Sequence, residues 1–262
     1  MIGNAERSFF EGYSDSFTWS SGCDRADQFL SGLDSLPADV RTVLRDEFGI
    51  EFPGPEPERT ERWLLQSRLL TWRGKIVFVP ILELVQHDPK AQPYSERDGV
   101  TLTGTFGEEV RMGRSMLSPF AAFWKFGIAS PERQAFSLPM TLTTESGREV
   151  VIEQLMNLNA TLGAFPVPDF KVEGPAVQFS CLMIGSSRTP KLSRAIFYRI
   201  MREAGETKPE HVFDSVLHIN RLSFLKLLEA LESQEGQLVP TLRKVVRFQL
   251  EAMSWCIGTR EL

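Results

Sequence analysis

The sequence of 262 residues has few of the side chains that most often carry protein chemistry, with three cysteines, three histidines and three tyrosines. Cys23, Cys181 and Cys256 are widely spaced and form no CxxC pair, which argues against a disulfide framework and is typical of a reducing compartment. His211 and His218 lie two turns apart in an expected helix, too far to share one metal ion. We therefore predict no metal site.

Long hydrophobic runs are also missing. The longest run, 76–85, is interrupted by Pro80 and Glu83, and it is far shorter than the roughly 20 residues that a membrane span requires. The first ten residues include Glu6 and Arg7 and have no apolar stretch of the kind found in a signal peptide. These absences predict a soluble, cytoplasmic protein with no membrane contact.

Neither sign of charge dominates. The chain has 34 acidic and 29 basic residues, a formal net charge of -5, and 42% hydrophobic residues, as is usual for a globular protein. This balance gives no general attraction to nucleic acid, so we expect no nucleic-acid partner. Common catalytic motifs are absent too: we find no GxGxxG, GxxxxGK[ST], GxSxG or HExxH. The loop at 185–188 is read as a polar connection between a strand and a helix.

Apolar periodicity predicts an α+β fold. Residues at helical spacing predict helices at 24–36, 37–48 and 58–70, and a helical chain from Pro190 to the end. Short apolar or alternating runs predict strands between them, with a helix at 119–126 and a turn at 98–99. The expected strands are 76–81, 109–112, 135–143, 148–155 and 176–184.

The last part of the chain carries two apolar stripes at helical spacing. We expect their helices to pack antiparallel across a turn at 234–236. The first stripe contains Val212, Val216, Ile219, Leu222 and Leu225, and the second contains Leu238, Leu242, Val246, Leu250, Met253 and Ile257.

One stretch, from about Glu61 to Leu142, carries several short motifs in a fixed order. The motifs are QSR at 66–68, VPILELVQHDPKA at 79–91, GEEV at 107–110 and FGI at 126–128. In order and spacing they resemble the second half of a SET domain. The most similar branch is that of the Rubisco large-subunit lysine methyltransferase, whose motifs read SR, VPxxDxxNH, GEExxxxY and YGF.

The resemblance implies a fold, a cofactor and a partner. It implies several short β-sheets of SET type followed by an α-helical C-terminal domain, with regions at 1–60, 61–185 and 186–262. It also implies S-adenosylmethionine as cofactor and a protein lysine as methyl acceptor. The residues that would bind the cofactor are Arg68, Glu83 at the Asp position, Gln86 at the Asn position, His87, and Phe126 at the Tyr of YGF.

The catalytic group is left unassigned by the same comparison. The Tyr that would follow the GEE motif is replaced by Arg114, which has no acceptor and is always charged. A guanidinium there would face a sulfonium of the same sign, so Tyr94 or Tyr198 would have to supply the hydroxyl. The Gly-rich strand and turn of the first half of a SET domain is not found in 1–74.

Simpler interpretations stay open at this point. His87 could be a partly buried histidine held by Asp88, and Arg68 could be a surface or ion-pair residue. Three functions therefore remain: an active protein-lysine methyltransferase, a SET-like fold that has lost catalysis and binds a protein partner as a scaffold, and an unrelated α+β protein.

Overall fold

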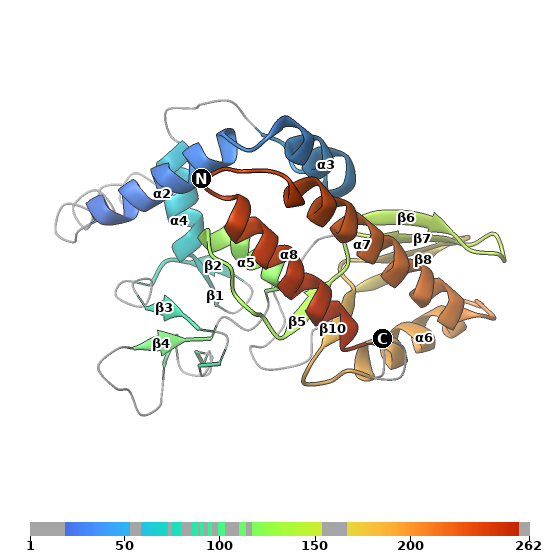
Figure 1. Cartoon of the computed structure of the whole chain (residues 1–262). Coiled ribbons are helices and arrows are strands. Elements are labelled where there is room, and N and C mark those ends of the chain that lie inside the picture. The colour runs from blue at the N-terminus through green and yellow to red at the C-terminus, as the bar shows by residue number, and fades with distance from the viewer. Residues whose placement is uncertain are drawn as a thin grey trace.

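The structure is a computed structural model, and it confirms the α+β class. It describes residues 19–52, 59–72, 75–79, 85–88, 90–91, 94–95, 99–102, 110–113, 117–153 and 167–256. The described part of the chain contains seven helices (Figure 1): α2 (Trp19–Asp34), α3 (Ala38–Phe48), α4 (Arg59–Arg68), α5 (Pro119–Phe126), α6 (Leu192–Glu203), α7 (Pro209–Glu232) and α8 (Val239–Ser254).

The strands are short and form four small sheets within the described residues. Their bounds are β1 (Leu70–Trp72), β2 (Lys75–Val77), β3 (Gln86–His87), β4 (Arg111–Met112), β5 (Gln134–Phe136), β6 (Met140–Thr143), β7 (Glu149–Ile152), β8 (Phe170–Glu173), β9 (Ala176–Phe179) and β10 (Met183–Ser186). The pairs β1–β2, β3–β4 and β5–β10 each form a two-stranded sheet, and the fourth sheet has the order β6-β7-β9-β8. Figure 1 shows β3 and β4 at one end of the molecule and the four-stranded sheet at the other.

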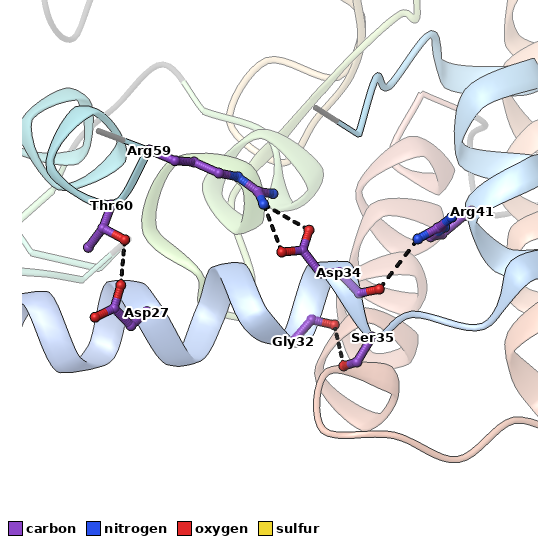
Figure 2. A network of polar contacts seen from close by, with 7 residues as sticks. All are labelled: Asp27, Gly32, Asp34, Ser35, Arg41, Arg59 and Thr60. Carbon is purple, nitrogen blue, oxygen red and sulfur yellow. Dashed lines mark hydrogen bonds and ion pairs between the residues drawn. The ribbon is translucent and has the colours of Figure 1, made fainter. Parts of the chain in front are cut away.

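Helices α2 and α4 are joined by polar contacts, which Figure 2 shows. Nη1 of Arg59 donates to both carboxylate oxygens of Asp34, each at 2.8 Å. Thr60 donates to Asp27, and Nη1 of Arg41 donates to the carbonyl oxygen of Asp34 at 3.4 Å. Exposed contacts of this kind contribute little free energy.

Two of the strands expected from the sequence are each divided in the structure. Segment 135–143 covers most of β5 and all of β6, and segment 176–184 covers all of β9 and the first half of β10. At each break the chain leaves one sheet for another, because β5 pairs with β10 whereas β6 and β9 both pair with β7. The amide of Ser137 donates to the carbonyl of Leu182 at 2.8 Å, so the two breaks meet. The expectation of two continuous strands was therefore wrong, and tertiary pairing is the reason.

Asn220 on α7 holds this corner between the two sheets. Its side chain is fully buried. Its Oδ1 accepts from the amide of Leu138 at 2.8 Å, and its Nδ2 donates to Oγ of Ser137 at 3.0 Å and to the carbonyl of Val216 at 2.8 Å. The buried amide thus gives the backbone N–H of Leu138, which lies in the strand break, an acceptor, and has partners for its own donors.

Helices α7 and α8 pack against each other, as the sequence predicted. The stripe on α8 is confirmed for Leu238, Leu242, Val246 and Met253, which are buried, while Ile257 lies outside the described residues. The stripe predicted on α7 was partly wrong, because Ile219, Leu222 and Leu225 are each more than 40% exposed. The buried face of α7 instead contains Val212, Phe213, Val216, Leu217, Asn220, Phe224, Leu227 and Leu231.

One large hydrophobic cluster unites elements from along the described chain. It includes Phe29 of α2, Phe120 of α5, Phe179 of β9 and Phe213 of α7. It therefore contains residues from each of the three regions expected from the sequence, whose boundaries stay predictions. Helix α8 lies directly on β10, since a Cβ on Gly185 would be 2.1 Å from the carbonyl oxygen of Ala252. Among the described residues, no helix is long and apolar enough to cross a membrane.

Candidate functional site

Between α4, which ends with the QSR motif, and α5, which ends at the start of the FGI motif, the chain forms a small β-rich unit built from β1 to β4. Strand β1 pairs antiparallel with β2, and β3 pairs parallel with β4. Leu70, Tyr94 and Met112 are buried together between them, with Val77, Val79, Val85, Val100 and Leu102 packed around. The antiparallel bridge between Ser95 and Thr101 encloses the expected turn, where Gly99 has a φ of 108° and Asp98 lies outside the described residues.

Helices α4 and α5 end together beside this unit. Nε1 of Trp63 donates to the carbonyl of Trp124 at 3.0 Å, and Nζ of Lys125 lies 3.5 Å from the carbonyl of Leu69. These contacts bring the C-terminal ends of both helices to one junction, at which Arg68 ends α4 and Phe126 ends α5. Two of the predicted cofactor-binding residues are thus close in space, although 58 positions separate them in the sequence.

Strands β3 and β4 bring two of the motifs side by side. Gln86 is opposite Arg111 and His87 is opposite Met112 in the parallel ladder, so the QH dipeptide lies against the residues that follow GEEV. The amide of Asp88 continues the ladder by donating to the carbonyl of Met112 at 3.0 Å. The structure describes the backbone of Gln86 and His87 but not their side chains.

Asp88 has partners of its own at the end of β3. Its carboxylate lies 3.6 Å from Nη1 of Arg111 and accepts from the amide of Lys90 at 2.8 Å. Its carbonyl accepts from the amide of Ala91 at 3.0 Å, which forms a tight turn. Sequence reasoning missed Arg111 and its ion pair, because nothing in the sequence shows a parallel pairing between residues 23 positions apart.

Gly113 sits directly against that turn. A Cβ at this position would be 2.5 Å from the carbonyl oxygen of Ala91, so only glycine fits without a shift of the backbone. The chain therefore leaves β4 in close contact with residues 88–91. Arg114, which follows Gly113, and Glu83, the predicted cofactor-binding residue before β3, both lie outside the described residues.

The two tyrosines considered as substitutes have very different positions. Tyr94 is 5% exposed and belongs to the cluster with Leu70 and Met112, so it lies within the β1–β4 unit. Tyr198 lies on α6, which contacts α7 and β10 at the other end of the molecule (Figure 1). Its ring packs near Phe197 and Phe213, and burial raises the pKa of its hydroxyl above the usual value. The structure does not bring Tyr198 to the other site residues.

A separate small cavity lies where α5, α7 and α8 meet the break after β5. Its volume is about 30 Å³, and its lining includes Ser118, Ser137, Cys181 and Gln249. That space holds a water molecule or two but no nucleoside. No group of histidine, cysteine, aspartate or glutamate side chains among the described residues could hold a metal ion.

Comparisons with known proteins identify no relative of this chain. No family model, curated protein or solved structure matches the chain.

Proposed function

We propose that this chain is a divergent SET-like protein that binds S-adenosylmethionine and transfers its methyl group to a lysine of a protein substrate. The observation that carries the proposal is the β3–β4 ladder. It pairs Gln86 with Arg111 and His87 with Met112, so two of the segments that give the chain its resemblance are neighbours in space.

The side chains at the junction of α4 and α5 support the cofactor. Arg68 and Lys125 are cations, and a guanidinium grips a carboxylate such as that of the cofactor's amino-acid end. Nζ of Lys125 lies 5.7 Å from the centroid of the Phe126 ring, so the opposite face of that ring is the one that would take a sulfonium. These groups fit the carboxylate and the sulfonium of the cofactor's methionine part. When bound, the cofactor supplies the methyl group, and the chain's part is to hold the acceptor amine in line.

The same proposal places the protein in the cytoplasm. Cys181 and Cys256 are both buried and form no disulfide, which suits the reducing cytoplasm that we expect from the sequence.

A second candidate is a SET-like protein that has lost catalysis and serves as a scaffold for a protein partner. Two observations favour it: Arg114 takes the position of the tyrosine, and Tyr198 lies at the far end of the molecule. In that case the unit could keep a binding role without methyl transfer.

Isothermal titration with S-adenosylmethionine and with its demethylated product, followed by a methylation assay on a lysine peptide, separates these candidates. We expect a dissociation constant below about 100 µM, equivalent to about -5.5 kcal/mol. Arg68→Gln should weaken binding by about tenfold or more, because it removes the bidentate contact with the carboxylate. Arg62→Gln is the matched control, since Arg62 is an exposed residue of the same helix. Circular dichroism of both variants checks that α4 is retained.

Three outcomes are possible, and each supports or contradicts a different candidate. Binding together with methylation of a lysine peptide supports the enzyme, and binding without turnover supports the scaffold. No heat at millimolar ligand contradicts cofactor binding and therefore the proposal itself.

A further inference from the structure

Apolar side chains lie opposite one another across the strands of the four-stranded sheet and form rows on its core face. These rows continue to the edge strand β8, where nothing in the described chain covers them. Ile152, Phe179 and Phe170 are opposite one another in successive strands β7, β9 and β8. Ile152 and Phe179 are at most 1% exposed, whereas Phe170 is 44% exposed. Phe197 of α6 stacks on Phe179 at 5.2 Å, so the helical cover ends at β9.

The neighbouring row repeats this pattern. Val150, Val177 and Val172 are opposite one another in the same three strands. The first two are fully buried, and Val172 is 47% exposed. Two apolar side chains on the core face of β8 are therefore left in solvent, which is unusual for a face that elsewhere is packed.

The backbone of β8 is also available for pairing. The amide of Ser180 donates to the carbonyl of Asp169 at 2.9 Å, which shows that residue 169 forms a hydrogen-bonded pair with β9. In an antiparallel ladder such pairs alternate, so the backbone N–H and C=O groups of Lys171 and Glu173 also point toward β9. The N–H and C=O groups of Phe170 and Val172 therefore point away from the sheet. Within the described residues, no strand pairs with this edge of β8.

The charges along β8 are self-complementary. Lys171 lies between Asp169 and Glu173, and all three side chains are on the face opposite the apolar rows because strand side chains alternate. Two copies of β8 can pair antiparallel about a two-fold axis at either outward residue. An axis at Val172 places Lys171 opposite Glu173 of the other copy, and an axis at Phe170 places it opposite Asp169. Each register forms two ion pairs and brings the exposed apolar side chains together.

We propose that β8 is a homodimer interface, at which a second copy of this chain adds its own β8 antiparallel and extends the sheet across both copies. A lysine in an edge strand normally discourages such pairing. Here the acids two positions away on each side turn that lysine into half of a complementary pair. The interface is isologous, as a two-fold dimer requires.

Sedimentation equilibrium of the full chain tests the proposal, at concentrations up to about 500 µM because a short edge-to-edge interface binds weakly. We expect a reversible monomer–dimer equilibrium for the wild type. Lys171→Glu should raise the dimer dissociation constant by about tenfold or more, because two attractive cross-strand pairs become repulsive. Val172→Pro should abolish the dimer, since it removes an N–H that faces outward and plays no part in the β8–β9 ladder.

A charge exchange identifies the register. Mixing Lys171→Glu with Glu173→Lys should restore a heterodimer if the axis lies at Val172, and mixing it with Asp169→Lys should do so if the axis lies at Phe170. Thr141→Glu is the matched control, because Thr141 is an exposed residue of β6, the opposite edge strand. A wild type that stays monomeric at every concentration overturns the proposal. So does a dimer that Lys171→Glu leaves unchanged.

Discussion

The two hydrophobic clusters of this protein differ in how strongly they are packed. The large cluster contains five phenylalanines that are almost completely buried: Phe123, Phe179, Phe197, Phe213 and Phe224. The small cluster of the β1–β4 unit has only Leu70, Tyr94 and Met112 as buried apolar residues in the described chain. Few buried contacts give a segment a low free energy of local opening. We therefore expect the β1–β4 unit to open more easily than the large cluster.

The largest expected effect comes from adding a side chain at Gly185, where α8 lies directly on β10 in the well-packed part. Gly185→Ala should lower the free energy of unfolding by about 3 kcal/mol or more, because its Cβ would lie 2.1 Å from a backbone oxygen of α8 that cannot move alone. Urea unfolding followed by circular dichroism measures it. Gly147→Ala is the control: its φ is 78° and nothing lies within 4 Å of the added Cβ, so it should cost only about 1 kcal/mol. Equal losses would show that α8 can shift to make room.

Removing the side chain that holds the sheet corner should be the next largest effect. Asn220→Ala leaves the buried amide of Leu138 without its acceptor and opens a cavity, and we expect a loss of about 2–3 kcal/mol in unfolding free energy. Ser215→Ala on the exposed side of the same helix should change it by less than about 0.5 kcal/mol. A small loss for Asn220→Ala would mean that water replaces the amide at the corner.

The thiol of Cys256 should make the free energy of unfolding of the well-packed part decrease at alkaline pH. Burial raises the pKa of this thiol from 9.0 to about 11. The unfolded chain therefore releases its proton first, so the stabilisation is complete below pH 9 and is lost as pH rises toward 11. The loss amounts to about 2 kcal/mol. Unfolding free energies measured from pH 8 to 11 should fall more steeply for the wild type than for Cys256→Ala. Parallel curves would contradict the assignment.

The smallest global effect is expected from the loosely packed unit. Gly113→Ala pushes a Cβ to 2.5 Å from the carbonyl of Ala91, yet we expect the global unfolding free energy to change by less than about 0.5 kcal/mol, because the unit opens before the rest. Hydrogen exchange should show the difference, with the amide of Asp88 exchanging about tenfold faster than in the wild type. A full loss of stability in urea would show instead that the two clusters unfold as one.

Local sequence determined some elements completely. Helix α5 begins and ends at the predicted residues, because Oγ of Ser118 accepts from the amide of Ala121 at 3.2 Å and Gly127 ends the helix with a φ of 67°. Helix α3 likewise follows Pro37 and ends before Gly49. Caps of this kind act within a few residues, so a single sequence reveals them.

Elements whose limits depend on distant partners were not predictable in the same way. The break in 135–143 is set by Asn220 and Leu182, far along the chain. Helix α7 has apolar residues on two faces, and its neighbours, not its periodicity, decide which face is buried. Strand β8 was missed, although its alternation beside the turn at Gly174 was a usable indication.

The candidate site likewise has one part that local sequence predicted and another that depends on distant partners. The short motifs named Arg68 and Phe126, and the structure brings these two residues to one junction. The parallel pairing of β3 with β4, and with it the contact between Asp88 and Arg111, is a long-range event. No local pattern encodes it, so sequence reasoning named the motifs without their geometry.

The corner at Ser137, Leu182 and Asn220 also has a consequence for the order of events in folding. Its contacts join residues up to 83 positions apart, and closing loops of that length costs chain entropy before any burial compensates for it. The helical hairpin of α7 and α8 is held by contacts close in sequence and can form earlier. Asn220 should therefore make its native hydrogen bonds after the folding transition state, so that its replacement speeds unfolding and leaves the folding rate almost unchanged.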